Sequence, residues 1–117
     1  ETLAAAALRE AFEEVGLPPQ QVELLGCLPP YRTISDYRVY PFVGWVEAPV
    51  RFVPDPTEVD DVFLVPLRFV VDPANHHRGS IVHEGVTRSF FVIPYFGYRI
   101  WGATAGILIM LARTLAA

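Results

Sequence analysis

The chain has no lysine, a single cysteine and no long hydrophobic run, and the last two features exclude particular kinds of site and of protein. All nine basic residues are arginine. One cysteine, Cys27, excludes an intramolecular disulfide and a zinc site built from cysteines. A lone thiol fits a reducing compartment, so we expect a cytoplasmic protein in which Cys27 is inert and buried. The longest nearly apolar run, Ile100 to Ala112, covers 13 residues. Because a bilayer span needs ~20, we expect no membrane partner.

Charge is also scarce, at 19% of the 117 residues, whereas 52% are hydrophobic. This composition predicts a folded chain of one domain, residues 1–117, rather than a disordered one. The net charge of −4 argues against a nucleic-acid partner, because binding to a polyanion needs a basic surface. Residues 1–61 carry −7 and residues 62–117 carry +3. That asymmetry suits a site where carboxylates hold a cation and arginines meet an anion.

Proline, by contrast, is abundant, and its eleven copies confine long helices to the two ends of the chain. Residues 1–15 are rich in strong helix formers, and Gly16 followed by Pro18 marks the end of this helix. No Ser, Thr, Asp or Asn stands ahead of the segment, so we expect the helix to begin without a cap. Residues 101–116 predict a second helix.

The middle of the chain is typical of β-structure. Residues 21–28 are mostly apolar and strand-like, and aromatic and β-branched residues predict strands over residues 37–46 and 88–93, with Pro41 marking an edge or a bulge. Residues 61–66 form a further short apolar run. The polar stretch over residues 72–87, which holds all three histidines, is predicted as a loop. Helix, strands and helix together predict an α/β fold with helices packed on a sheet.

The first helix carries the residues most suggestive of chemistry. Glu10 and Glu14 lie one turn apart, and Glu13 lies beside both, so their carboxylates repel one another. Arg9 relieves part of this repulsion by pairing with Glu13, four residues on. A hard divalent cation would relieve more, since Mg²⁺ prefers oxygen ligands. A solvated charged face is the alternative that the charge pattern leaves open.

The order of these residues resembles the Nudix box. Glu1 stands where the first glutamate of the box belongs, and the match resumes after seven residues over Arg9 to Leu17, with Ala11 in place of a bulkier aliphatic residue. Only the first glycine of the box and the five residues after it are missing. The resemblance implies a Nudix hydrolase with an α/β/α sandwich and a mixed sheet. It also implies that the N-terminal strands are absent, so that residues 1–117 form a single, partial domain.

Later segments resemble the coenzyme A pyrophosphatase branch of this family. The most branch-specific of them is Trp101 to Ile107, which reads Trp-Gly-Ala-Thr-Ala-Gly-Ile. This resemblance implies hydrolysis of the pyrophosphate of coenzyme A or its derivatives to 3′,5′-ADP and 4′-phosphopantetheine. The alternatives are hydrolysis of another nucleoside diphosphate derivative, such as an ADP-sugar or a dinucleotide, and a catalytically silent nucleotide-binding fragment.

The resemblance also assigns roles, residue by residue. Glu10, Glu13 and Glu14 would ligate Mg²⁺ or Mn²⁺, Arg9 would orient the carboxylates, and Glu1 would support Arg9. A metal-activated water would attack a pyrophosphate phosphorus, with Glu10, Glu58 or Asp60 as candidate general bases. The substrate-binding residues stay unassigned. A sheet without its first strands would expose an edge, which a second copy in a homodimer, a swapped segment or upstream residues would cover.

Weaker signals lie in the second half of the chain. His76, His77, His83 and Glu84 are either exposed loop residues or a metal site, and Arg78 with Arg88 is a candidate contact for a substrate phosphate. Gly102 and Gly106, four apart on an apolar helix, predict close packing against the sheet.

Overall fold

The computed structural model describes residues 1–47 and 49–117, and the chain falls into two compact units. Unit 1 comprises residues 1–29 and 40–64, and unit 2 comprises residues 30–39 and 65–117. Unit 1 holds ten acids and two arginines, a net charge of −8, whereas unit 2 holds three acids and seven arginines, a net charge of +4. The charges therefore separate by unit even more sharply than by halves of the sequence.

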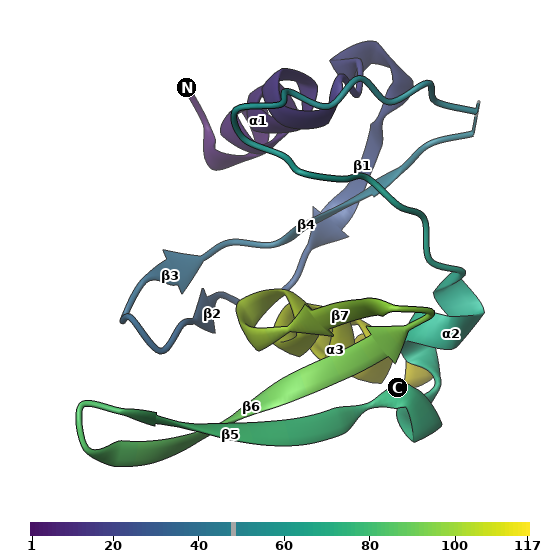
Figure 1. Ribbon diagram of the computed structural model, residues 1–117. Helices are drawn as coiled ribbons and strands as arrows, with labels where there is room; N and C mark the ends of the chain where they lie inside the picture. Colours follow the sequence, from purple (N-terminus) through teal and green to yellow (C-terminus); the bar gives the residue numbers. More distant parts are fainter. Residues whose placement is uncertain (48) are drawn as a thin grey trace. The chain divides into compact units, whose positions relative to one another are not determined.

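Unit 1 consists of a helix, a short 3-10 helix and a two-stranded sheet (Figure 1). The helix is α1 (Leu3–Val15), and the 3-10 helix η1 (Pro19–Gln21) follows it. Strands β1 (Glu23–Cys27) and β4 (Phe42–Trp45) pair antiparallel, and their register shifts between Leu24 and Gly26. The predicted helix and the strand over residues 21–28 are confirmed.

The start of α1 differs from the expectation, because the helix does have a cap. It begins at Leu3, and the Thr2 hydroxyl accepts a hydrogen bond from the Ala5 N–H at 3.0 Å. The helix therefore starts two residues later than the propensities indicate, so that Thr2 stands ahead of it and satisfies one of the free N–H groups of its first turn.

Unit 2 is built on a three-stranded antiparallel sheet in the order β5-β6-β7 (Figure 1). Its strands are β5 (His77–His83), β6 (Val86–Tyr95) and β7 (Tyr98–Trp101), and α3 (Gly102–Ala116) follows the last of them. A short helix α2 (Leu67–Val71), a 3-10 helix η2 (Pro73–Asn75) and the short strand pair β2 (Tyr31–Arg32) and β3 (Arg38–Val39) complete the unit. Helices and antiparallel sheets together confirm the predicted α/β class.

Two sequence-based assignments in the middle of the chain were wrong or incomplete. The polar stretch over residues 72–87 is not a loop, because most of it pairs with β6 as β5, the two strands turning at Glu84 and Gly85. The stretch 37–46 is two strands, β3 and β4, with Tyr40 and Pro41 between them, and Pro41 has no N–H to donate to a neighbouring strand. The apolar run 61–66 joins no strand, and α2 begins directly after Pro66, whose ring fixes a helix-compatible φ.

The core of unit 2 lies between α3 and β6. Ile93, Ala105 and Ile109 are almost wholly buried, and four half-buried side chains pack around them: Phe69, Phe91, Ile100 and Leu108. The close packing predicted for the glycines of α3 is confirmed at Gly106, where an added Cβ would overlap the ring of Tyr31. At Gly102 nothing lies close enough to meet a Cβ.

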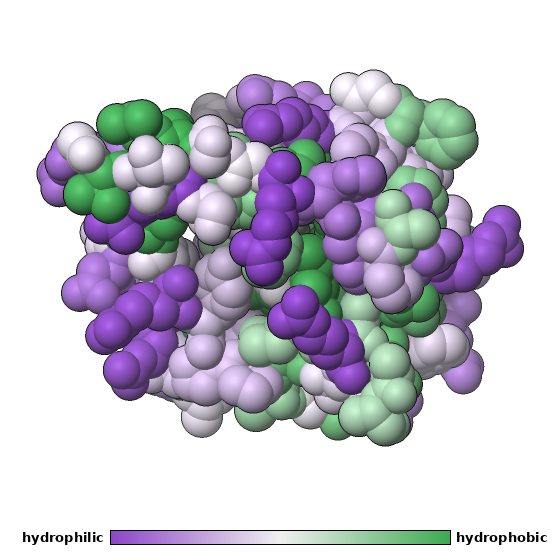
Figure 2. Space-filling model, turned by 90° about the horizontal axis from the view of Figure 1, so that it is seen from below, coloured by the Kyte–Doolittle hydropathy of each residue, from purple (hydrophilic) through white to green (hydrophobic). Residues whose placement is uncertain are grey.

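Large hydrophobic side chains stay exposed in both units, and Figure 2 shows hydrophobic surface between hydrophilic side chains on one face. Cys27 is exposed, so the prediction of a buried thiol was wrong. The reason is local: every residue of β1 is exposed, because this strand pairs only with β4 in a two-stranded sheet. Among the described residues no helix combines the length and the hydrophobicity needed to cross a membrane.

Candidate functional site

One hollow in unit 1 gathers the acids of α1 with two acids from the segment that follows β4. Its volume is about 520 Å³, and its wall is formed by six side chains: Arg9, Glu10, Glu13, Glu14, Asp55 and Glu58. We call it the acidic hollow. The structure thus brings together the four candidate residues of the first helix. Of the two later acids considered as general base, Glu58 lines the hollow and Asp60 does not.

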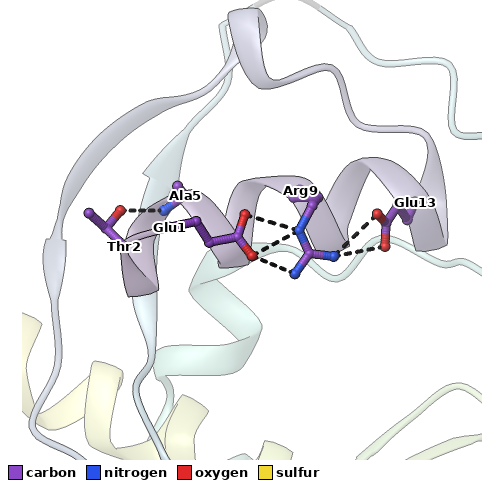
Figure 3. A network of polar contacts seen from close by, with 5 residues as sticks. All are labelled: Glu1, Thr2, Ala5, Arg9 and Glu13. Atoms are coloured by element: carbon purple, nitrogen blue, oxygen red, sulfur yellow. Dashed lines mark hydrogen bonds and ion pairs between the residues drawn. The ribbon is translucent and has the colours of Figure 1, made fainter.

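Arg9 is bound by two carboxylates that come from opposite directions along α1 (Figure 3). Its Nε donates to Glu1 Oε1 at 3.0 Å and its Nη2 to the same oxygen at 2.7 Å. Its Nη1 donates to both oxygens of Glu13 at 3.2 Å. The guanidinium is therefore held in one orientation between Glu1 and Glu13, at the spacing of eight and four residues that one helix face provides.

This arrangement divides the acids of α1 into two kinds. The hydrogen bonds that Arg9 donates to Glu1 lower the pKa of Glu1, and those that it donates to Glu1 and Glu13 raise its own pKa. The charge of Glu13 is thus offset by Arg9. Among the described residues Glu10 and Glu14 have no ion-pair partner. Of the acids of α1, these two carboxylates, one helical turn apart, are the ones whose charge no described arginine offsets.

The second wall of the hollow is attached to the C-terminal end of α1 by the backbone. The N–H of Val53 donates to the Val15 carbonyl at 2.9 Å, and the N–H of Asp55 donates to the Glu14 carbonyl at 2.8 Å. These carbonyls have no partner within the helix, because they lie in its last turn. The segment after β4 therefore satisfies the helix end and, in doing so, brings Asp55 beside the acids of α1.

Gly16 makes this attachment possible. Its φ of +73° is a left-handed conformation that favours glycine. A Cβ at this position would also lie only 3.0 Å from the Cβ and the N of Val53. A side chain at residue 16 would thus push away the segment that carries Asp55 and Glu58.

Asp55 is held in place by Thr57. The N–H and the hydroxyl of Thr57 donate to Asp55 Oδ1 at 3.0 and 2.8 Å, and these two bonds lower the pKa of Asp55. The N–H groups of Glu58 and Val59 donate to the Asp55 carbonyl, which turns the chain. Sequence reasoning missed Asp55, although Asp-Pro-Thr is the kind of pattern in which an aspartate bonds to the backbone two residues on.

The donor set of the acidic hollow suits a hard divalent cation. All of its anionic donors are carboxylate oxygens, the ligand type that Mg²⁺ and Mn²⁺ prefer. Within residues 1–47 and 49–117, no three acidic, histidine or cysteine side chains converge on one point. Mg²⁺ does not require such a cage, because it is usually held by one or two carboxylates together with waters and substrate phosphates. The pair Glu10 and Glu14 therefore fits such an ion.

The histidines take other positions. His76 contacts the Val70 carbonyl oxygen through Nε2 at 2.6 Å, and His77 and His83 lie at the two ends of β5. Arg78 and Arg88 are also on this hairpin, opposite Phe91 and Ile81. Residues that are close together in the sequence, His77, Arg78 and His83, are therefore spaced out along β5 by its pairing with β6.

Comparison with known proteins places the chain in a family. The model of the NUDIX domain matches residues 1–85. The chain is 38% identical over 116 residues to the uncharacterized Nudix hydrolase NudL of Klebsiella pneumoniae subsp. pneumoniae, covering 99% of this chain and 60% of that relative. For NudL of Escherichia fergusonii the identity is 39% over 108 residues, covering 92% and 56%. The chain thus spans about 60% of the length of the curated relatives it matches. Since the family model covers most of its residues, the chain belongs to the Nudix family.

Proposed function

We propose that the protein is a metal-dependent pyrophosphohydrolase that acts on a nucleoside diphosphate derivative, with coenzyme A or one of its derivatives as the substrate. The observation that carries the proposal is the acidic hollow, which Glu10 and Glu14 line together with Asp55 and Glu58, and in which Glu10 and Glu14 form no ion pair with any described residue. The family and the names of the relatives support hydrolysis. The substrate, the products 3′,5′-ADP and 4′-phosphopantetheine, and a cytoplasmic location rest on the sequence alone.

Each residue of the hollow has a distinct part in this proposal. Glu10 and Glu14 hold Mg²⁺ or Mn²⁺, with Glu13 as a third ligand whose orientation is set by Arg9. Glu1 fixes Arg9 from the other side. When bound, the ion supplies polarisation of the phosphoryl oxygens and a more acidic water. The pairing of Arg9 with Glu13 lowers the net negative charge of the hollow, which favours entry of an anionic diphosphate.

Of the three candidates for the general base, Glu10, Glu58 and Asp60, we favour Glu58 and Glu10. Glu58 lines the hollow, whereas Asp60 is outside its wall. A base must come within hydrogen-bond reach of the proton that it removes. A base at Glu58 would lie on the wall opposite α1 and would leave Glu10 and Glu14 to the cation.

The choice of coenzyme A rests on the segment Trp101 to Ile107. The names of the relatives specify no substrate. Another nucleoside diphosphate derivative, such as an ADP-sugar or a dinucleotide, is the enzymatic alternative. The non-enzymatic alternative is binding of a nucleotide without turnover. A homodimer that covers a sheet edge is compatible with each of these three functions.

The test is turnover of coenzyme A with Mg²⁺ or Mn²⁺, with the products identified by mass spectrometry. Glu14→Gln removes a proposed ligand, and Glu23→Gln makes the same change on the exposed strand β1, outside the hollow. We expect 4′-phosphopantetheine from the unaltered protein and from Glu23→Gln, and none from Glu14→Gln. Turnover that survives Glu14→Gln overturns the role of the hollow. Turnover of ADP-ribose or a dinucleotide but not of coenzyme A overturns only the substrate.

A further inference from the structure

A second hollow, with the opposite charge, lies within unit 2. It has a volume of about 360 Å³ and lies between the sheet and the last turns of α3, where Arg78, His76 and Arg113 line it together with Phe91 and two alanines of α3. We call it the cationic hollow. None of the residues that line it is acidic.

Both arginines lie against the same aromatic ring. Arg78 and Phe91 are opposite one another in the β5–β6 ladder, and the guanidinium carbon of Arg78 is 4.5 Å from the ring centroid. The guanidinium carbon of Arg113, from α3, is 6.0 Å from that centroid. Two positive charges are thus brought to one ring from two different elements. A guanidinium over a ring gains cation–π energy and still has N–H donors for an anion.

Neither charge is balanced by an acid. Among the described residues the side chains of Arg78 and Arg113 form no ion pair or hydrogen bond. Of the acids in unit 2, Asp36 pairs with Arg32 and Asp72 accepts a hydrogen bond from the Ala74 N–H. Arg113 lies in the last turn of α3, where the helix C-terminus offsets part of its charge. Arg78, on a strand, has no such compensation.

The rest of the wall is shaped for an apolar group. Phe91 is half-buried, Ala112 is buried, and Ala116 adds a small side chain one turn later. The His76 ring is held by its contact with the Val70 carbonyl. A ligand that fills this hollow therefore meets two guanidinium groups and an apolar surface at once.

We propose that the cationic hollow binds a small phosphate monoester that carries an aromatic or aliphatic group. A phosphate monoester has a charge between about −1.5 and −2 at neutral pH, enough to balance both arginines, whereas a carboxylate balances one. Its oxygens accept the paired N–H groups of guanidinium, and its organic group covers Phe91 and the alanines. The cationic hollow shares no lining residue with the acidic hollow and needs no metal, so its test does not depend on the proposed function.

The test is a titration with phenyl phosphate, in the presence of a chelator, followed by calorimetry and by amide NMR shifts. Arg78→Gln is expected to weaken binding at least ~10-fold, because it removes charge-assisted hydrogen bonds. Arg113→Gln is expected to weaken it less. The matched control is Arg99→Gln, since Arg99 lies 5.6 Å from the ring centroids of both Phe90 and Trp101 but does not line the hollow. Its affinity should match that of the unaltered protein.

Two further ligands distinguish the chemistry. Benzoate keeps the ring and one negative charge, and benzyl alcohol keeps the ring alone. We expect benzoate to bind more weakly than phenyl phosphate and benzyl alcohol to bind weakest, with amide shifts centred on Phe91 and Ala112. Equal affinities for phenyl phosphate and benzoate overturn the phosphate assignment. No binding of phenyl phosphate, or equal binding by Arg78→Gln when circular dichroism shows that variant folded, overturns the site.

Discussion

The backbone N–H of Asp55 donates to the carbonyl oxygen of Glu14 at 2.8 Å. This single bond joins residues 41 positions apart, one in the last turn of α1 and one in a proline-rich segment. It places a second row of carboxylates beside the first, and it uses a carbonyl that the helix itself leaves free. The acidic hollow therefore depends on how α1 ends as much as on the acids that it carries.

Replacing Gly16 with alanine should separate these two rows. The left-handed backbone costs an L-residue roughly 1–2 kcal/mol, and the Cβ would also press on Val53, adding about 1–3 kcal/mol of overpacking. Gly85→Ala is the matched control, because Gly85 has a similar φ of +77° but nothing within 4 Å of an added Cβ. Urea unfolding should show a larger loss of stability for Gly16→Ala. Equal losses would mean that Val53 moves aside freely.

Metal binding should depend unequally on the three glutamates of α1. If they hold the ion as proposed, Glu10→Gln and Glu14→Gln should each weaken Mn²⁺ binding at least ~10-fold, because each removes a carboxylate charge that no arginine offsets. Glu13→Gln should have a smaller effect, since Arg9 already offsets its charge. Electron paramagnetic resonance of free Mn²⁺ measures all three affinities. If Glu13→Gln had the largest effect, the distinction between Glu13, which pairs with Arg9, and the unpaired Glu10 and Glu14 would be wrong.

Thr57 should act on the hollow through Asp55. Thr57→Val keeps the shape of the side chain and the backbone N–H but removes the hydroxyl that donates to Asp55 Oδ1. The pKa of Asp55, which Thr57 lowers, should return toward its ordinary value, as carboxyl NMR shifts would record. Thr57→Ser should restore the lowered pKa. Thr114→Val removes a hydroxyl that bonds the Met110 carbonyl in α3, and should leave Asp55 unchanged.

Acid should destabilise unit 1 through Glu1. Its folded-state pKa is below the ordinary value of 4.5 because Arg9 donates hydrogen bonds to it. A lowered folded-state pKa gives stability that is present above the unfolded-state pKa and is lost as the pH falls through the folded one. Unfolding at a series of pH values below 4.5 should show this loss, and Arg9→Gln should reduce it. An unchanged acid dependence in Arg9→Gln would exclude the ion pair as its cause.

Gly106→Ala should destabilise unit 2 although alanine is the better helix former. The substitution gains up to about 1 kcal/mol of helix propensity, but the new Cβ would overlap the Tyr31 ring in a buried contact. Thermal unfolding should show a lower melting temperature. The double variant Gly106→Ala with Tyr31→Ala removes the overlap and should recover part of the loss. A melting temperature raised by Gly106→Ala alone would show that Tyr31, on β2, moves away from α3 at little cost.

Local sequence determined the two end helices, the strands over residues 21–28 and 88–93, and the four candidate site residues of α1. These features depend on neighbours within a few residues: helix propensity, the stop at Gly16, and carboxylates one turn apart. The order Glu1, Arg9, Glu10, Glu13 and Glu14 was enough to indicate the family.

Only the tertiary structure decided the rest, because it depends on pairing between distant segments. The polar stretch with the histidines forms strand β5 because it pairs with β6. Cys27 is exposed because its strand, β1, pairs only with β4. Asp55 is brought to the site by a hydrogen bond between its backbone N–H and the Glu14 carbonyl, and such a bond leaves no pattern of side chains in the sequence. Arg78 and Arg113 met at Phe91 because α3 packs on the sheet. Sequence thus specified which residues carry charge, and backbone pairing decided which of those charges meet.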